Sequence, residues 1–344
     1  MFDSPGSAAQ YGFCKGLSTS HALSVVGSKI AKTLNRKESA LVVLLDLEKA
    51  YDSVNIAKLM EKLTDWGLPQ NLGRCLWNYM NDRFFAVRMD GEMSSIFNAV
   101  VGLPQGAALA PALFKAFVAD FPVPANPAIT VVQFADDVAV VATGRPLEAN
   151  RIMNEYLREV ACFYQQNDLQ CNATKSQALL ITGTLNRLDH AARRDTKQIV
   201  VEMDGMFISN VISAKYLGVT LNQKYSFVEH VTSITRKMTS ITGLMNGLLQ
   251  RKGNLISAVK YTFYKTAIRS CAAYGFGIWS GVSSHQMEVL RRAERKFLRW
   301  GRADRGRQAG TYKFVNSSEV YRDAKVTRID AWMLHQRIDA CSAT

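Results

Sequence analysis

The residues best suited to chemistry are two adjacent aspartates, Asp136 and Asp137, in the stretch "TVVQFADDVAVVATG" (130–144). The apolar residues on both sides predict two strands joined by a tight turn. A third aspartate, Asp46, lies near the end of the apolar run "ALVVLLDL" (40–47), whose pattern is typical of a strand covered on both faces. Because the ends of neighbouring antiparallel strands meet, we expect Asp46 and Asp136 to face each other at one edge of a sheet, with Asp137 beside them.

Three neighbouring carboxylates repel one another unless divalent cations hold them or some are protonated. Ligands that are all oxygens suit Mg²⁺ or Mn²⁺ rather than Zn²⁺. Two such ions, about 3.5–4 Å apart, activate an attacking hydroxyl and stabilise the leaving oxygen of a phosphoryl transfer. The structural alternative stays open, since paired aspartates are also common in tight turns, where Asp tolerates left-handed backbone and caps N–H groups.

Between these carboxylates lies a loop, "VVGLPQGAALAPALF" (100–114), that has features of a nucleotide-binding loop. Gly102 and Gly106 permit sharp turns and close approach to a ligand. A helix beginning near Gly106 would offer free N–H groups to a phosphate. Gln105 has both amide donors and an acceptor, which suit the sugar or base edge of a nucleotide. An ordinary loop followed by a helix cap would have the same pattern.

The elements that must position these residues predict an α+β fold, with helices packed on an antiparallel sheet. Beyond about residue 225 the strand patterns fade, and a helix over 285–300 with one apolar stripe indicates a smaller, basic, helical domain. The other expected elements are a helix within 55–69 that stops at Gly67 and Pro69, helices over 106–121 (kinked or starting later because of Pro111) and 147–167, a hairpin over 84–102 turning at Asp90–Gly91, and a strand over 178–183.

Composition narrows the class of protein. The chain has 344 residues, of which 48% are hydrophobic, so it is expected to fold. No apolar run reaches the roughly 18–20 residues of a membrane span, and no signal-peptide pattern is present. The six cysteines are scattered without zinc-ligand spacing, which is typical of reduced thiols in a nuclear or cytoplasmic protein that is neither secreted nor membrane-bound.

The charge is unevenly distributed along the chain. The formal net charge is +13, with −1 over residues 1–180 and +14 over residues 181–344. A basic half beside a neutral half indicates a polyanionic partner, and nucleic acid before any other. A lysine-rich surface that only aids solubility is the alternative.

Five motifs in order resemble the reverse transcriptases of non-LTR (LINE-type) retrotransposons. They are "LLDLEKAYDSV" (44–54), "GLPQGAALAPALF" (102–114), "FADD" (134–137), "LQCNATKSQALLI" (169–181) and "YLGVTLN" (216–222). In addition, "QYGFCKGLSTSHAL" (10–23) is similar to the fingers motif of that family, and 270–300 is similar to its segment after the palm. The resemblance implies a right-hand polymerase with partial fingers over 1–40, a palm over 41–225, and a basic, thumb- or connection-like helical domain over 226–344.

The resemblance also implies an activity and a catalytic set. The enzyme would be an RNA-directed DNA polymerase that transfers a nucleotide from a dNTP to a primer 3′-hydroxyl, with an RNA template and a DNA primer as partners. Asp46, Asp136 and Asp137 would form the catalytic triad, with Asp46 and Asp136 as the main ligands of two Mg²⁺ (or Mn²⁺) ions. Lys175 would protonate the pyrophosphate leaving group.

Further binding roles follow from the same resemblance. Tyr51 would stack under the incoming sugar and exclude a 2′-hydroxyl, although a core tyrosine is its alternative reading. Gln105 and Gly106 would line the nucleotide pocket. A primer-grip hairpin would contain Tyr216, Leu217 and Gly218.

The chain departs from the family pattern in three places. Only nine residues precede Gln10, whereas members usually begin with a longer fingers region. Cys14 and Leu17 stand where phosphate-gripping arginines are expected, and Ala107 and Ala110 replace small polar residues or glycine. We therefore expect an N-terminally truncated fragment without endonuclease or Cys/His knuckle, and with weak or no independent activity. The alternatives are a non-catalytic nucleic-acid-binding relic or domesticated derivative, and an unrelated α+β scaffold.

Overall fold

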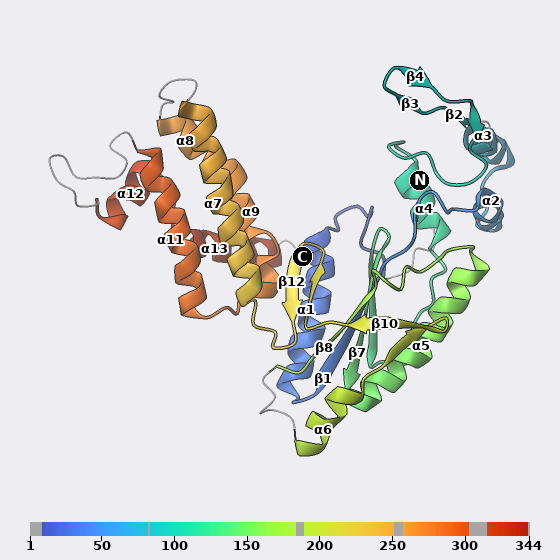
Figure 1. Ribbon diagram of the computed structural model, residues 1–344, viewed down its shortest axis with the longest axis horizontal. Coiled ribbons are helices and arrows are strands. Elements are labelled where there is room, and N and C mark those ends of the chain that lie inside the picture. The colour runs from blue at the N-terminus through green and yellow to red at the C-terminus, as the bar shows by residue number, and fades with distance from the viewer. Residues whose placement is uncertain (1–8, 82, 184–188, 251–256, 303–314, 343–344) are drawn as a thin grey trace. The chain divides into compact units, whose positions relative to one another are not determined.

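The computed structural model describes residues 9–81, 83–183, 189–250, 257–302 and 315–342 (Figure 1). The chain divides into two compact units, which are considered separately below. The first comprises Met1–Leu217 and Asn222–Tyr225, and the second comprises Gly218–Leu221 and Ser226–Thr344. Within the described residues, every helix is too short or too polar to cross a membrane.

The first unit is built on a six-stranded sheet with the order β6-β7-β1-β8-β10-β9. Its strands are β1 (Ser39–Leu45), β6 (Ile129–Phe134), β7 (Asp137–Gly144), β8 (Gln177–Ile181), β9 (Val201–Met203) and β10 (Met206–Asn210). Two small sheets pair β2 (Phe84–Phe85) with β5 (Phe97–Asn98) and β3 (Arg88–Met89) with β4 (Glu92–Met93). The helices are α1 (Thr19–Asn35), α2 (Ile56–Asp65), α3 (Gln70–Asn81), α4 (Ala110–Phe117), α5 (Pro146–Gln166), α6 (His190–Asp195) and the 3₁₀ turn η2 (Thr196–Gln198).

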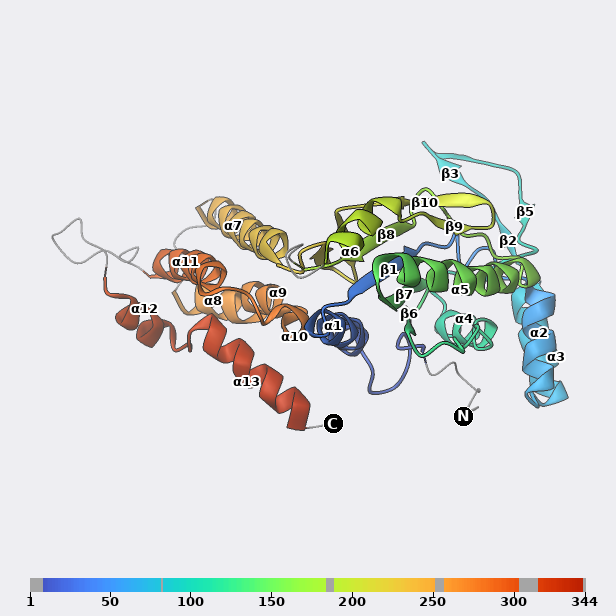
Figure 2. The same ribbon diagram turned by 90° about the horizontal axis from the view of Figure 1, so that it is seen from below.

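The central strand β1 is buried on both faces, as its continuous apolar run predicts. Because successive side chains of a strand face opposite sides, Leu41 and Val43 join the core cluster that α5 and α4 complete. Ala40 and Val42 are also fully buried but point to the other face of the sheet, and α1 contacts β1, β6 and β7. Figures 1 and 2 both show α5 lying along the sheet. The covered sheet gives the aspartates at its edge a rigid base.

The structure confirms the α+β class and most of the expected elements. The strands over 40–47 and 178–183, the strand-turn-strand over 130–144 and the helix over 147–167 are all present. The helix expected over 106–121 is confirmed in its later-starting form, because Pro111 occupies the first turn of α4, where its missing N–H is not needed.

One expectation about the elements needs correction. The sheet is antiparallel at its other pairings, but β8 and β10 pair in parallel. The helix predicted within 55–69 is confirmed as α2, which ends at Asp65, and the left-handed Gly67 agrees with the predicted stop at that glycine. Helix α3 was not among the expected elements, although Leu72, Leu76 and Tyr79 follow helical spacing within it.

In the second unit the described elements are helical apart from β12 (Val219–Asn222), which pairs with β11 (Ser213–Tyr216). The last residue of β12, Asn222, is assigned to the first unit. The helices are α7 (Val228–Gln250), α8 (Ser257–Phe263), α9 (Arg269–Ala273), α10 (Phe276–Trp279), α11 (Ser284–Gly301), α12 (Ser317–Ala324) and α13 (Ile329–Ser342). A π-helical turn, η3 (Tyr264–Ile268), joins α8 to α9. The expected helix over 285–300 is confirmed as α11, with Leu290 and Phe297 buried.

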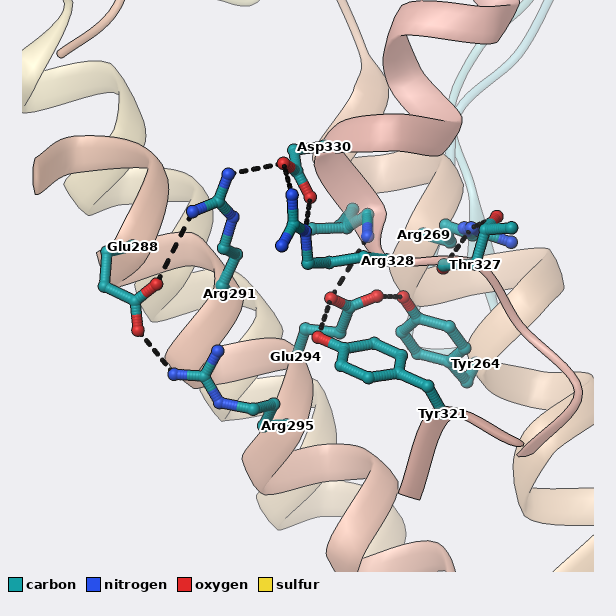
Figure 3. A network of polar contacts seen from close by, with 11 residues as sticks. Tyr264, Arg269, Glu288, Arg291, Glu294, Arg295, Tyr321, Thr327, Arg328 and Asp330 are labelled. Atoms are coloured by element: carbon teal, nitrogen blue, oxygen red, sulfur yellow. Dashed lines mark hydrogen bonds and ion pairs between the residues drawn. The ribbon is translucent and has the colours of Figure 1, made fainter. Parts of the chain in front are cut away.

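A buried polar network holds the helices of the second unit together (Figure 3). Glu294 on α11 is fully buried and accepts hydrogen bonds from the hydroxyls of Tyr264 and Tyr321 and from the Ile329 N–H. Arg269 donates to the carbonyl of Thr327 (2.7 Å), and its guanidinium lies 4.2 Å from the ring centroid of Trp332. One carboxylate thus ties α11 to the π-helical turn, to α12 and to α13.

Candidate active site

The sheet brings the three aspartates together at one end of the adjacent strands β1 and β7. Leu45, the last residue of β1, pairs with Val138 of β7, so that Asp46 comes next to Asp137, the first residue of β7. Asp136 lies in the tight turn between β6 and β7, which the pairing of Phe134 with Asp137 closes. This convergence follows from the antiparallel pairing of two buried strands.

The three carboxylates influence one another electrostatically. Partial burial raises the pKa of Asp137, and the negative charges of Asp136 and Asp46 raise that pKa further. Three mutually repelling oxygen donors are suited to a hard divalent cation. In the described part of the chain, no group of three His, Cys, Asp or Glu side chains stands close enough to hold a metal ion, so a cation would have to draw these carboxylates together.

The backbone of Asp46 is fixed by the turn that precedes β8. The Asp46 N–H donates to the hydroxyl of Ser176 (3.1 Å), and the Asp46 carbonyl accepts from the N–H of Asn172 (2.8 Å). Lys175 belongs to the same turn, and its Nζ is 4.0 Å from Oδ2 of Asp46. Both side chains are largely exposed, so the pair adds little stability. The pair places the Lys175 ammonium group beside the carboxylate of Asp46.

Tyr51 lies between the core and the carboxylates. Its ring stacks on Phe114 of α4, with the ring centroids 4.7 Å apart. Burial raises the pKa of the Tyr51 hydroxyl, and the charge of Asp136 adds to the increase. Tyr51 therefore packs against the core and also lies near Asp136, and its contact with an incoming sugar stays a prediction.

The loop with Gln105 is clamped to the segment that follows Asp46. The N–H groups of Gly102 and Leu103 donate to the carbonyls of Val54 (2.9 Å) and Tyr51 (2.8 Å). Nε2 of Gln105 donates to both carboxylate oxygens of Asp52, at 2.9 and 3.0 Å. Asp52 thereby orients the Gln105 amide, so that Oε1 of Gln105 points away from the Asp52 carboxylate. Sequence reasoning missed Asp52, although it stands within a quoted motif.

The expectation of a helix terminus beside Gly106 is wrong. Helix α4 begins four residues later, at Ala110, and the intervening residues form turns in which the Ala107 N–H donates to the carbonyl of Pro104. The helix N–H groups are therefore not adjacent to Gly106. Gly106 itself has a left-handed backbone, with φ +83°.

Gly102→Ala is expected to destabilise the first unit by roughly 2–4 kcal/mol. Gly102 has φ +83°, and a Cβ there would lie 2.7 Å from the Cα and carbonyl oxygen of Asp52. Gly106→Ala is the matched control, because Gly106 has the same φ but nothing within 4 Å of the added Cβ. Urea unfolding of both variants measures the difference. Equal losses would contradict the importance of the contact with Asp52.

Of the residues expected in the primer grip, Tyr216 and Leu217 belong to the first unit, and Gly218 begins the second. Tyr216 ends β11 and is buried; its hydroxyl has no hydrogen-bond partner among the described residues. Burial raises the pKa of that hydroxyl, and the charge of Asp137 contributes, which places Tyr216 near the carboxylates. Leu217 and Gly218 follow with φ values of +40° and +82°, as a tight hairpin requires.

Cys14 and Leu17 stand at the two positions where arginine was expected, and neither provides a positive charge. Cys14 is a free cysteine whose thiol donates to the carbonyl of Gln10 (3.2 Å). Leu17 is 41% exposed. Neither side chain replaces a guanidinium fork.

The fold, the three neighbouring aspartates and the basic second unit are typical of a polymerase. Comparison with known families agrees. The chain belongs to the family described as reverse transcriptase (RNA-dependent DNA polymerase), whose model matches residues 2–221. The family resemblance drawn from the motifs is thus confirmed.

Two of the relatives found among curated proteins are described as RNA-directed DNA polymerases of mobile elements. The chain is 26% identical over 327 residues to the RNA-directed DNA polymerase from mobile element jockey of Drosophila melanogaster, covering 93% of this chain and 34% of that protein. It is 28% identical over 277 residues to the probable RNA-directed DNA polymerase from transposon BS of the same species, covering 78% and 30%. The chain therefore spans about one third of the length of the curated relatives it matches.

Among solved structures, one similar protein is telomerase from Candida albicans, in complex with the TWJ fragment of telomeric RNA. The TM-score is 0.48 at 12% identity, and the match covers 93% of this chain and 55% of the telomerase chain. At this level the similarity adds nothing to the assignment of function.

Proposed function

We propose that this chain acts as the RNA-directed DNA polymerase region of a non-LTR retrotransposon protein, extending a DNA primer on an RNA template with dNTPs. The observation that supports this most is the convergence of Asp46, Asp136 and Asp137 at one sheet edge in a chain of the reverse transcriptase family. A protein that only binds nucleic acid has no use for three carboxylates there, since they repel phosphate.

In this proposal Asp46 and Asp136 hold two Mg²⁺ or Mn²⁺ ions, with Asp137 beside them. When bound, the ions would lower the pKa of the primer 3′-hydroxyl and neutralise the triphosphate. Asp46 keeps its position because Ser176 and Asn172 fix its backbone. Tyr51, backed by Phe114, serves as the floor for the sugar, and Gln105, oriented by Asp52, faces the nucleotide; Gly106 lies beside it.

The proposed division of the chain is a fingers segment over 1–40, a palm over 41–225 and a thumb-like domain over 226–344. Residues 181–344 have a net charge of +14, which suits contacts with template and primer phosphates. Tyr216, Leu217 and Gly218 would support the primer terminus in this arrangement. RNA template, DNA primer and dNTP are the proposed partners.

Lys175→Met is expected to lower kcat by about 10²-fold or more, because Lys175 is the proposed donor of a proton to the pyrophosphate. Its Nζ is 4.0 Å from Asp46, at the edge where the leaving group would lie. Lys197→Met, at another exposed lysine of the first unit, is the control. Single-turnover incorporation of dTTP checks the prediction, and an equal rate for both variants would remove Lys175 from the mechanism.

Primer extension tests the proposed function itself. The purified chain is incubated with poly(rA)/oligo(dT), dTTP and Mg²⁺, with EDTA as the control. Extension that requires Mg²⁺ supports the polymerase. Binding of the template–primer without extension, at any Mg²⁺ or Mn²⁺ concentration, would favour the non-catalytic alternative. The observation that supports this alternative is the presence of Cys14 and Leu17 where arginines were expected.

A further inference from the structure

The turn that carries Asp136 is held by residues near the start of the described chain. Residues 9–11 run beside the end of β6, the edge strand of the main sheet. The Gln133 N–H donates to the carbonyl of Ala9 (2.8 Å), and the Tyr11 N–H donates to the carbonyl of Gln133 (2.8 Å). Gln10 and Gln133 thus form a parallel bridge, which brings the Gln10 side chain to the β6–β7 turn.

The amide of Gln10 engages both polar backbone groups of Ala135. Oε1 of Gln10 accepts from the N–H of Ala135 (3.1 Å), and Nε2 of Gln10 donates to the carbonyl of Ala135 (3.2 Å). Oε1 also accepts from the Gly12 N–H (2.8 Å), and Nε2 also donates to Oε1 of Gln133 (3.3 Å). Gln10 is 5% exposed, so these bonds are shielded from water. One buried side chain therefore fixes the peptide groups on either side of the Ala135 Cα.

Ala135 needs such support because its backbone is left-handed, with φ +59°. Residues with a Cβ disfavour this conformation, and here it determines the direction in which Asp136 leaves the turn. The approach of the Gln10 segment also depends on Gly12, since a Cβ at that position would lie 2.2 Å from the backbone nitrogen of Ala135. Gln10 and Gly12 together are shaped to fit this turn.

We propose that Gln10 is a positioning residue for the Asp136–Asp137 pair. Its amide clamps Ala135 in the left-handed conformation, and so keeps both carboxylates directed toward Asp46 when a divalent cation binds. Gln10 acts through Ala135 and touches neither substrate nor cation. The inference rests on the proposed function and goes beyond it, because it assigns a supporting role to a residue 126 positions away from Asp136 in the sequence.

The test uses Gln10→Met, which keeps the size of the side chain and removes its hydrogen bonds. Titration with Mn²⁺, followed by electron paramagnetic resonance of the free ion, is expected to show about 10–100-fold weaker binding, the range typical for residues that support metal ligands from outside. The Mn²⁺ concentration for half-maximal primer extension should rise in parallel. Tyr156→Phe is the matched control, since it removes a buried hydrogen bond to the Pro122 carbonyl elsewhere in the unit. Equal Mn²⁺ affinities for the two variants would contradict the proposed role of Gln10.

A second measurement separates this inference from the proposed function. If the wild type binds no Mn²⁺ and extends no primer, the proposed function fails, whereas hydrogen exchange of the Ala135 amide still decides the clamp. Exchange is expected to be at least about tenfold faster in Gln10→Met than in Tyr156→Phe, because the Ala135 N–H loses its buried acceptor. Unchanged exchange would refute the clamp. If Gln10→Met does not fold, Gln10→Asn, shorter by one methylene, replaces it in both measurements with a smaller effect in the same direction.

Discussion

Replacing Asp136 with asparagine is expected to lower the rate of primer extension by about 10³-fold, while the chain stays folded. The substitution removes a negatively charged oxygen from the proposed cation site, and the variant should also lose most of its Mg²⁺-dependent binding of dTTP in calorimetry. Asp136 is exposed at its turn, so the fold does not depend on it. Its charge also contributes to the raised pKa of Asp137, so its removal should bring that pKa back toward the ordinary range for an aspartate.

The control for Asp136→Asn is Asp90→Asn. Asp90 is likewise exposed in a tight turn, where its φ of +50° suits asparagine equally well. Primer extension by this variant should equal that of the wild type. Equal dTTP binding heats for the wild type and Asp136→Asn would instead contradict the role of Asp136 in the proposed cation site.

Removing the buried carboxylate of the second unit with Glu294→Ala is expected to lower the free energy of unfolding of that unit by roughly 3–5 kcal/mol. The substitution leaves the hydroxyls of Tyr264 and Tyr321 and the Ile329 N–H without their acceptor, and it opens a cavity among α11, α12 and α13. Hydrogen exchange of the α11 amides in increasing urea measures the loss. Glu229→Gln on the exposed side of α7 is the control and should change stability by less than about 1 kcal/mol.

The same carboxylate predicts how stability depends on pH. Burial raises the pKa of Glu294 above its value in the unfolded chain, so ionisation of this group opposes folding. Its contribution is therefore fully present below the unfolded pKa of about 4.3 and is lost as the pH rises through the higher folded pKa. The stability of the wild type relative to Glu294→Gln should be greatest in acid and decline toward neutral pH. A difference that is constant with pH, or that grows as the pH rises, would contradict the assignment.

The sequence predicts that the three aspartates lie close together, because the apolar patterns of the strands that carry them are local and strong. Two long apolar runs predict the buried strands β1 and β7, and antiparallel pairing then requires the aspartates at their ends to converge. The α+β class follows from the same runs. The parallel pairing of β8 with β10 was not predictable, because it depends on a connection of 24 residues between them and not on either strand alone.

The parts of the site that the sequence did not indicate depend on side-chain contacts over long separations. The amide of Gln10 reaches a backbone 125 residues away, which leaves no periodic trace in the sequence. Asp52 orients Gln105 across 53 residues. Glu294 stands among arginines on a helix whose apolar stripe was predicted, and only the packing of Tyr264 and Tyr321 against it reveals a buried acid.

The π-helical turn Tyr264–Ile268 has a consequence for changes in chain length. Its i→i+5 hydrogen bonding sets Tyr264 and Arg269, five residues apart, on the same side of the helix, and the Arg269 guanidinium lies 6.0 Å from the centroid of the Tyr264 ring. In an ordinary α-helix, residues four apart share a side. Deleting one exposed residue of the turn, Lys265 or Thr266, would therefore turn the segment into regular helix and keep both side chains facing Glu294 and Thr327. We therefore expect the segment to tolerate the loss of one residue with its tertiary contacts kept.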